Sequence, residues 1–377
     1  MKVVVAVDSF KGSLSSLKAG LCVKEGIQRV DPGIEVIVKP LADGGEGTVD
    51  ALTEGMKGEK VMLTVTGPLG TPVKCEYGMV GKTAIIEMAG AAGLTLVPKE
   101  KRNPERTTTY GVGEVLLDAM DKGCRKFVVG IGGSATNDGG TGMLKALGYE
   151  FLKKDGRPIL EGARGLKDLS YIKKEHVDER LQDCQFFVAC DVNNPLCGEH
   201  GCSAIYGPQK GADMEMVARM DEGMQHYANV VKKAVPTADD TAPGAGAAGG
   251  LGFAFLAFTN ATLESGIQIV MKEIQLEEAM QGADLVVTGE GRLDGQTARG
   301  KAPVGVAKLA KAHHLPVLAF SGSVTKDAGA CNEEGIDAFF PILRRVGTLE
   351  EVMDEMNASE NLKDTVEQVI RFYKACR

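Results

Sequence analysis

Short β-branched runs and helical repeats follow one another at the start of the chain. Residues 3–7 (VVVAV) form an apolar run that stops at Asp8, and apolar positions every three or four residues continue a helical pattern to residue 30. Residues 34–40 (IEVIVKP) form a second strand-like run. A strand, a helix and a strand in this order predict a parallel pair joined by a right-handed crossover.

The same rhythm returns near the end of the chain. The patterns predict strands at 283–291, 315–323 and 336–342, a helix at 302–313, and a capping box at 348–351 that opens a C-terminal helix. The two ends of the chain therefore predict one Rossmann-like, doubly wound α/β domain.

The middle of the chain predicts a second α/β domain inserted into the first. Its pattern indicates two antiparallel strands within 71–89, strands at 126–131 and 185–192, and a helix at 111–121. Residues 244–258 are glycine followed by an apolar helix. From typical domain sizes we expect a discontinuous domain of residues 1–65 plus 265–377 and an inserted domain of residues 66–264. Glycine and carboxylate clusters follow the predicted strands of both domains, so we expect the active site in the cleft between them.

Composition narrows the class of protein. The 377 residues carry a net charge of −8, 5% aromatic residues and no Trp, which disfavours a basic, base-stacking surface for nucleic acid. No apolar run has the length of a membrane span, and the short N-terminal run does not resemble a signal peptide. The nine cysteines show no metal-binding spacing and fit reduced thiols, so we expect a cytoplasmic protein. The sequence does not determine the oligomeric state, and a homo-oligomer is one of the possibilities.

Glycine-rich segments suggest contact with an anion but match no standard nucleotide-binding motif. Residues 128–148 (VVGIGGSATNDGGTGMLKALG) join a predicted strand to a helix without the GK[ST] of a P-loop. Residues 244–250 (GAGAAGG) match G-x-G-x-x-G, but no strand precedes them, which favours close helix packing over dinucleotide binding. In residues 295–302 (GQTARGKA), Ala302 stands where a P-loop needs Ser or Thr, although Lys301 at a helix start still suits an anion.

One of these segments shares a pattern with an earlier stretch. Residues 43–52 and 138–147 both read D-G-G-x-G-x-x-x-A-L, and each lies between a predicted strand and a helix. Two interpretations stay open. The aspartates cap helices in two independent tight turns, or both turns face ligands, with oxygens for Mg²⁺ supplied by Asp43, Glu46 and Asp138.

Three charged residues beside predicted strand ends are candidates for catalysis. Lys11, between a strand and a helix, either binds a phosphate or carboxylate or is a solvated surface lysine. Arg292 suits the same ligands, with a structural ion pair to Glu290 or Asp294 as the alternative. Asp191 ends an apolar strand, so it either caps the following NNP turn or acts as a base.

No motif for a covalent nucleophile appears in the sequence. It has no G-x-S-x-G elbow, no Cys–His pattern and no cluster among its five histidines. Glycine turns, carboxylates and a few cations fit phosphoryl transfer, which depends on positioning and charge neutralisation.

The sequence resembles the bacterial glycerate kinase family of glyoxylate and glucarate metabolism along nearly its whole length. The blocks that carry the resemblance are VDSFKGSLSS, PLADGGEGTVDAL, RNPERTTTYGVGE, GIGGSATNDGGTGMLKALG, VACDVNNPLCGEHG, YGPQKGA, GAGAAGGLG and TGEGRLDGQTARGK. The resemblance implies a Rossmann-like domain with an inserted α/β domain, and ATP-dependent phosphorylation of D-glycerate with Mg²⁺. It favours 2-phosphoglycerate as the product over 3-phosphoglycerate, and it leaves the catalytic residues to be inferred.

The residues and the resemblance together give a set of assignments to test. We expect Lys11 and Arg292 to neutralise charge and Asp191 to act as the base, with Asp43 or Asp294 as alternative bases. The expected nucleotide-binding residues are Gly132, Gly133, Ser134, Asn137 and Lys301. A kinase for another small hydroxy acid is the nearest alternative, followed by a dehydrogenase and a non-enzymatic anion-binding protein.

Overall fold

A computed structural model describes residues 1–45 and 47–376, which fall into two compact units. Unit 1 comprises Met1–Asp43, Asp50–Lys57 and Ile267–Arg377, and unit 2 comprises Gly44–Val49 and Gly58–Gly266. Residues 59–65, which the sequence analysis places in the first domain, belong to unit 2 because they form a strand that pairs there. None of the helices in the described residues has the length and apolar character needed to cross a membrane.

Unit 1 is built on a five-stranded parallel sheet in the order β13-β12-β11-β1-β2. Its strands are β1 (Lys2–Val7), β2 (Glu35–Val38), β11 (Leu285–Leu293), β12 (Val317–Val324) and β13 (Ala338–Pro341). The chain leaves β1 toward β2 in one direction, and β11, β12 and β13 extend in the other. The strand order therefore reverses between β1 and β11, where doubly wound folds bind ligands.

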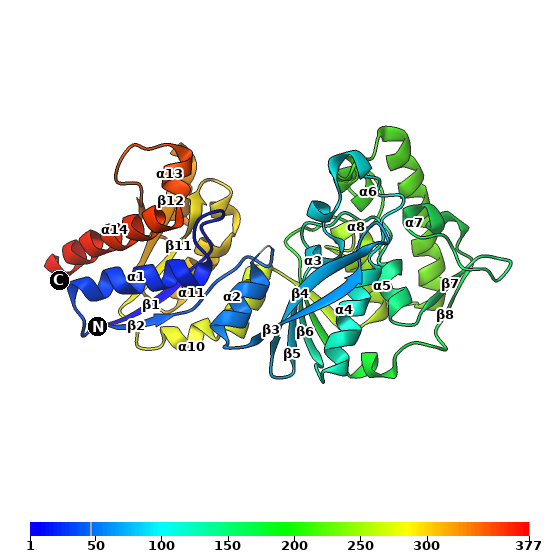
Figure 1. The fold of residues 1–377 in the computed structure, drawn as a ribbon, viewed down its shortest axis with the longest axis horizontal. Coiled ribbons are helices and arrows are strands. Elements are labelled where there is room, and N and C mark those ends of the chain that lie inside the picture. Colours follow the sequence, from blue (N-terminus) through cyan, green and yellow to red (C-terminus); the bar gives the residue numbers. More distant parts are fainter. Residues whose placement is uncertain (46, 377) are drawn as a thin grey trace. The chain divides into compact units, whose positions relative to one another are not determined.

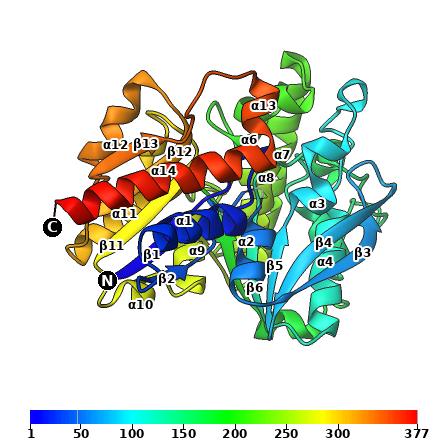
Figure 2. The ribbon, with the colours of Figure 1, turned by 60° about the vertical axis from the view of Figure 1, so that its left-hand side comes forward.

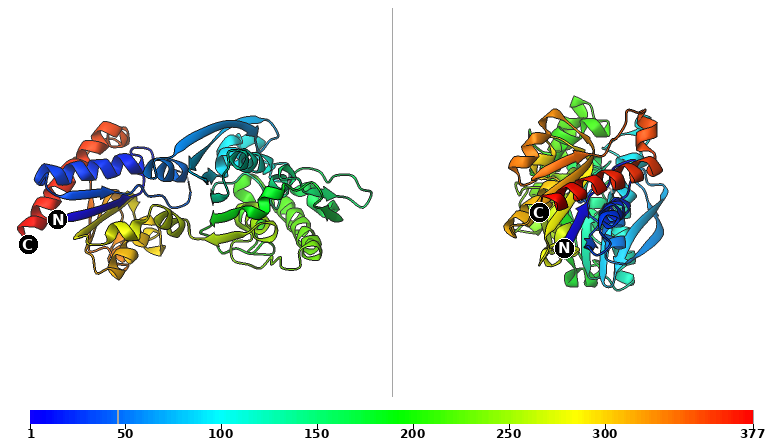
Figure 3. Two further views of the ribbon diagram at one scale, coloured as in Figure 1. Left: turned by 90° about the horizontal axis from the view of Figure 1, so that it is seen from below. Right: turned by 90° about the vertical axis from the view of Figure 1, so that its left-hand side faces the viewer.

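Helices cover both faces of this sheet, as the doubly wound class requires (Figures 1 and 3). The helices are α1 (Ser16–Val30), α2 (Thr48–Gly55), α9 (Gly266–Glu273), α10 (Leu276–Met280), α11 (Ala302–Ala312), α12 (Ala330–Glu333), α13 (Leu349–Met353) and α14 (Glu355–Ala375). The side chains of Val3, Val5 and Val7 on alternate positions of β1 join α1 and α14 in one apolar core. Helix α11 packs against β1, β11 and β12, on the opposite face.

The first and last long helices of the chain, α1 and α14, lie side by side (Figure 2). A Cβ atom on Gly26 would lie 2.6 Å from the backbone oxygen of Lys363, so the two helices approach more closely there than any larger residue allows. Arg29 in α1 also pairs with Asp364 in α14 at 2.9 Å. The two ends of the sequence thus complete the core of unit 1 together.

Unit 2 contains a six-stranded mixed sheet in the order β10-β9-β6-β5-β4-β3. Its strands are β3 (Glu59–Thr66), β4 (Pro72–Val80), β5 (Thr83–Glu87), β6 (Lys126–Gly130), β9 (Gln185–Ala189) and β10 (Ala261–Glu264). The first three are antiparallel neighbours, and β5, β6, β9 and β10 are parallel. The segments that follow β6 and β9 therefore leave the sheet at the same edge.

Helices and a small hairpin complete unit 2. The helices are α3 (Ala89–Ala92), α4 (Tyr110–Asp121), α5 (Thr141–Ala146), α6 (Cys202–Tyr206), α7 (Met214–Ala234) and α8 (Ala247–Phe258), and β7 (Glu150–Leu152) pairs with β8 (Tyr171–Lys173). Short 3₁₀ helices are η1 (Leu94–Leu96), η2 (Lys99–Lys101), η3 (Ala163–Asp168), η4 (Glu179–Asp183), η5 (Pro208–Lys210), η6 (Thr297–Arg299) and η7 (Lys326–Gly329), the last two in unit 1. The core of unit 2 includes Phe127 of β6 stacked on Phe186 of β9 at 4.9 Å.

One predicted strand extends further in the structure than expected. The strand predicted at 283–291 continues to Leu293, because Arg292 and Leu293 still pair with β12. Within 244–258 the expected order of a glycine run and then an apolar helix is present, since residues 248–250 have left-handed backbone angles and the regular helix follows Gly250. Gly249, at φ +68°, leaves no room for a side chain, because a Cβ atom would lie 2.1 Å from the Thr136 oxygen. The glycine run therefore packs against the turn that follows β6.

Candidate functional site

A cavity of about 360 Å³ opens in unit 1 at the carboxyl ends of β1, β11 and β12. Its position beside the reversal of strand order is where the doubly wound fold places ligands. The polar residues that line it are Asp8, Ser9, Lys11, Ser13, Asp43, Glu290, Arg292, Asp294, Lys301 and Ser323. Five of the predicted site residues in unit 1, namely Lys11, Asp43, Arg292, Asp294 and Lys301, are thus brought to one cavity.

Asp8, the first residue after β1, is the most perturbed carboxyl group on the cavity wall. It is only 5% exposed, and its Oδ1 accepts a hydrogen bond from the Ser9 N–H at 2.6 Å. Burial, followed by the negative charges of Asp43 and Glu290, raises the pKa of Asp8 from its ordinary 3.8 to about 7. A carboxyl group with this pKa can exchange a proton near neutral pH. The sequence analysis did not assign Asp8, although its place directly after a buried strand was a usable signal.

Glu290 in β11 adds a second buried carboxyl group to the cavity. It is 9% exposed, and burial raises its pKa, against the hydrogen bond from Thr297 and the charge of Lys301. The Thr297 hydroxyl donates to Glu290 Oε1 at 2.5 Å. Because Thr297 lies in η6, just before α11, this bond fixes the segment that carries Lys301 against the strand end.

Three cations face the same cavity from separate segments. Lys11 Nζ lies 4.0 Å from Asp43 Oδ2, with the lysine side chain 63% exposed. Arg292 Nε lies 3.5 Å from Asp294 Oδ2 and is also mostly exposed, so the predicted ion pair exists but is loose. Lys301 precedes α11 in the N-cap position. Cations that reach solvent beside buried carboxyl groups suit a charged ligand such as a phosphate chain.

Part of the lining of the cavity is apolar. Its apolar lining residues are Phe10, Ile342, Leu343, Leu349, Val352, Met353 and Ala358, most of them from the segment between β13 and α14. Leu343 and Leu349 are 43% and 77% exposed, so this part of the lining is open to solvent. The cavity thus combines a charged floor with a wall that suits a flat apolar group.

The glycine-rich turn after β6 is in unit 2. Gly132 and Gly133 are exposed, and Gly133 has φ +72°. Within the described residues, the backbone N–H groups of Gly132, Gly133 and Ser134 have no hydrogen-bond acceptor. Consecutive free amides around a left-handed residue form an anion-binding concavity. The sequence prediction of an anion-facing turn at these three residues has a suitable geometry, and it stays a prediction.

Deeper in this turn, the polar side chains are buried. Asp138 accepts hydrogen bonds from the backbone of Thr109, Gly140 and Gly142 and from the Thr109 hydroxyl, all between 2.8 and 3.1 Å. Burial raises its pKa, and these bonds oppose the rise. Asn137 is fully buried and donates to the Ser203 hydroxyl at 2.9 Å. For Asp138 the geometry favours the capping interpretation over a Mg²⁺ ligand.

The repeated D-G-G motif occupies two different environments. Asp43 lines the cavity of unit 1, whereas Asp138 organises a turn in unit 2. Glu46, the third predicted Mg²⁺ ligand, lies outside the described residues. Among the residues that are described, no three His, Cys, Asp or Glu side chains converge to hold a metal ion by themselves.

Asp191 lies two residues beyond β9 and is exposed. Its Oδ1 accepts a hydrogen bond from the Gly266 N–H at 3.1 Å. The sequence pattern placed Asp191 at the end of a buried strand, but β9 ends at Ala189 and the Asp191 carboxylate stays in contact with solvent. Asp191 and the turn at 132–134 both follow parallel strands of unit 2 and leave the sheet at the same edge.

Lys210 is a buried cation that the sequence analysis did not assign. It is 2% exposed, and its Nζ donates to Ser134 Oγ at 2.8 Å and to the Thr136 oxygen at 2.6 Å. It ends η5, in the stretch YGPQKGA, and nothing in these neighbours predicts burial. Only the packing of η5 under the turn after β6 reveals it.

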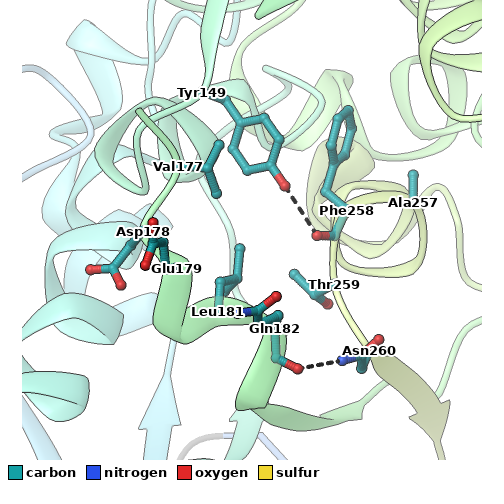
Figure 4. A pocket seen from close by; sticks show the side chains of 10 residues that line it. All are labelled: Tyr149, Val177, Asp178, Glu179, Leu181, Gln182, Ala257, Phe258, Thr259 and Asn260. Carbon is teal, nitrogen blue, oxygen red and sulfur yellow. Dashed lines mark hydrogen bonds between the residues drawn. The ribbon is translucent and has the colours of Figure 1, made fainter. Parts of the chain in front are cut away.

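A second cavity, of about 380 Å³, lies in unit 2 between Tyr149, η4 and the end of α8 (Figure 4). Its wall includes Asp178 and Glu179 and contains no lysine, arginine or histidine among the described residues that line it. Asp178 is already paired with Arg180 at 2.7 Å. This cavity does not suit an anionic ligand.

Comparison with known proteins agrees with this chemistry. The family model described as the glycerate kinase family matches residues 3–374. The glycerate 2-kinase of Escherichia coli is 48% identical over 353 residues, 93% of each chain, and the glycerate kinase of Bacillus subtilis is 45% identical over 379 residues, 100% of this chain and 99% of that one. A crystal structure named as glycerate kinase 2 of Salmonella typhimurium superposes with a TM-score of 0.93 at 44% identity, covering 100% of this chain and 98% of the other. The chain belongs to the glycerate kinase family.

Proposed function

We propose that this protein transfers the γ-phosphoryl group of ATP to a hydroxyl group of D-glycerate, with 2-phosphoglycerate as the favoured product. The observation that carries the proposal is the match to the glycerate kinase family over residues 3–374. The name of the Escherichia coli relative, glycerate 2-kinase, favours the 2-hydroxyl as the acceptor. No feature of the described residues favours a dehydrogenase, because the G-x-G-x-x-G stretch is a left-handed turn rather than a strand-to-helix fingerprint.

The cavity of unit 1 is our candidate for the nucleotide site. Glycerate is small and polar throughout, so it offers nothing to an apolar wall, whereas adenine does. In this assignment the adenine ring lies against Ile342, Leu349 and Val352, and the phosphates reach the cations of the floor, Lys11 and Lys301.

Asp8 is our candidate for the base. As the hydroxyl oxygen of glycerate bonds to the γ-phosphorus and the bond to the ADP oxygen breaks, the hydroxyl proton passes to the Asp8 carboxylate. A pKa of about 7 suits this exchange better than the ordinary carboxyl value. Lys11 and Arg292 then offset charge that develops on the transferred group and on the departing ADP. Asp191, the base expected from the sequence, remains a proposal to be separated from Asp8 by mutation.

Mg²⁺ is the metal expected with ATP. It prefers one or two carboxylates together with phosphate and water, so a cluster of three protein ligands is not required. Asp43 on the cavity wall meets this condition, and its distance of 4.0 Å from Lys11 allows both to serve one phosphate group. Mg²⁺ held there would neutralise negative charge on the nucleotide phosphates.

The proposal is tested by ATP turnover with D-glycerate, measured as ADP release in a coupled assay, with ³¹P NMR to assign the phosphorylated hydroxyl. A panel of small hydroxy acids, with lactate, tartronate and glycolate beside D- and L-glycerate, checks the substrate class. We expect D-glycerate to have the highest kcat/KM. ADP release that does not depend on any of these acids would contradict the proposal.

A further inference from the structure

Lys210 is an unusual lysine because it is buried without a carboxylate partner. Lys210 is 2% exposed, and it forms no ion pair with any of the described residues. By comparison, Lys153 of the same unit pairs with Asp168 at 3.2 Å. Its two acceptors, Ser134 Oγ and the Thr136 oxygen, are both neutral. A buried ammonium group without a counter-charge is costly, so its retention calls for a compensating partner.

The contacts of Lys210 determine the direction of the Ser134 hydroxyl. A protonated lysine has only donors, so Ser134 Oγ must accept from Nζ at 2.8 Å. The hydroxyl hydrogen of Ser134 is then left to donate, and no acceptor for it occurs in the part of the chain that the structure describes. Ser134 is 8% exposed, so this unused donor lies at the edge of the buried turn rather than in open solvent.

The same turn offers further unused donors. The N–H groups of Gly132, Gly133 and Ser134 have no acceptor among the described residues, and the first two residues are exposed. The hydroxyl group of the buried residue Thr136, two positions beyond Ser134, is also without a partner there. A row of backbone donors, an aligned hydroxyl and a positive charge behind them match the needs of a negatively charged oxygen.

We propose that Lys210 and the turn at residues 132–134 form a binding site for an anionic group of a substrate, in which Lys210 acts as a positioning residue through Ser134. The ligand chemistry is a carboxylate or phosphate oxygen, and its two sources are the carboxylate of glycerate and the phosphates of the nucleotide. The inference rests on the proposed kinase function for the identity of these ligands, but the anion site itself does not.

The electrostatic surroundings of Lys210 agree with a site that awaits a negative charge. Burial lowers the pKa of Lys210 to about 8, while Cys202 and Asp138 oppose this change. Asp138 does not pair with it, because the oxygens of Asp138 already accept four hydrogen bonds from its own turn and from Thr109. An anion bound to the turn would stabilise the charged form of Lys210 and the hydroxyl direction that it sets.

Two variants of the full chain test the site. Lys210→Met keeps a long apolar stem and removes the charge, and Ser134→Ala removes the hydroxyl that the charge orients. Lys153→Met is the control, since Lys153 is an ion-paired lysine of the same unit at the hairpin β7–β8. Isothermal calorimetry gives the Kd of each protein for D-glycerate, for the non-hydrolysable analogue adenylyl imidodiphosphate, and for inorganic phosphate. Steady-state assays give the KM of each substrate and kcat.

We expect Lys210→Met and Ser134→Ala to raise the Kd and KM of one substrate by about 10- to 100-fold, as for the loss of charge-assisted hydrogen bonds. The other substrate and the control should stay within about twofold of wild type, on the usual scale for surface changes. The substrate that weakens identifies the source of the anion. A general structural role predicts instead a lower Tm with both Kd values unchanged.

Two outcomes would overturn the site. One is a folded Lys210→Met protein, by circular dichroism, that binds both substrates and phosphate as wild type does. Another is a Ser134→Ala protein with unchanged affinities, which also decides the matter if Lys210→Met does not fold. A third outcome separates the two proposals. If the wild-type protein does not phosphorylate glycerate but binds inorganic phosphate, and Lys210→Met loses that binding, the proposed function is contradicted and the anion site is supported.

Discussion

Replacement of Asp8 by Asn should stabilise the protein at neutral pH while it removes activity. The pKa of Asp8 is raised to about 7, mainly by burial and then by Asp43 and Glu290. Between pH 3.8 and about 7 the folded protein therefore holds a proton that the unfolded chain releases, and folding loses stability as the pH rises through this interval. Above pH 7 the buried Asp8 carboxylate is charged, and its burial then lowers the free energy of unfolding by the full amount. Asn resembles the protonated form and does not incur this cost.

The size of the effect follows from the two pKa values. The interval from 3.8 to about 7 corresponds to about 4 kcal/mol, at about 1.4 kcal/mol per pH unit. The hydrogen bond from the Ser9 N–H survives, because the Asn side-chain oxygen still accepts it. For a unit of this size, each kcal/mol moves Tm by about 2–4 °C. We therefore expect Asp8→Asn to raise the Tm of unit 1 by up to about 8–16 °C at pH 8, and by little at pH 4.

The assay is differential scanning calorimetry of wild type and Asp8→Asn from pH 4 to 8.5, with EDTA and without nucleotide. Asp183→Asn is the control, because Asp183 is exposed at the end of η4 and has no buried charge to lose. The kcat of Asp8→Asn should fall by about 10²–10⁴-fold, the usual contribution of a base. A Tm difference that does not change with pH, or a normal kcat, would refute the assignment of Asp8.

Three further changes separate the roles proposed for other residues. Lys11→Ala should lower kcat by about 10²–10³-fold with an unchanged Tm, because its exposed pair with Asp43 at 4.0 Å adds little stability; turnover like wild type would exclude Lys11 from catalysis. Asp138→Asn should lower Tm by several degrees and by the same amount with and without Mg²⁺, whereas a loss seen only with Mg²⁺ would restore the metal-ligand interpretation. If Asp191 is the base, Asp191→Asn should lower kcat and leave ATP binding normal. If Asp191 only accepts the hydrogen bond from the Gly266 N–H, both kcat and ATP binding should stay unchanged, because the Asn side-chain oxygen can accept the same bond.

The fold was largely accessible from the sequence because its signals are local. The buried strands of unit 1 are uninterrupted apolar runs such as residues 3–7, and these predict a parallel sheet with helices on both faces. Strand β3 was missed because most of its residues are partly or fully exposed at the sheet edge, so its alternation is weak. The apolar helix after the glycine run is predictable from the sequence, but the left-handed backbone of residues 248–250 is not, because it depends on packing against the turn after β6.

The candidate site was harder to predict from the sequence, because it depends on which side chains are buried rather than on a sequence motif. Lys11, Asp43, Arg292 and Lys301 come from four separate segments, and the strand-end rule brought them together correctly. The sequence could not show that Asp191 is exposed or that Lys210 is buried, because both depend on packing between distant segments. Glu290, weighed from the sequence only as an ion-pair partner of Arg292, instead binds Thr297.

The side-by-side packing of α1 and α14 has a consequence for how the protein is made. Unit 2 contains an unbroken segment, Gly58–Gly266, which can fold as soon as it leaves the ribosome. Strand β1 must wait for β11, and at about 5–20 residues per second that delay is roughly 15–55 s. During this time the apolar run VVVAV has no completed core and is a target for chaperones or aggregation. Stalled nascent chains that end before β11 should therefore carry a protease-resistant unit 2 together with a protease-sensitive segment that contains β1 and α1.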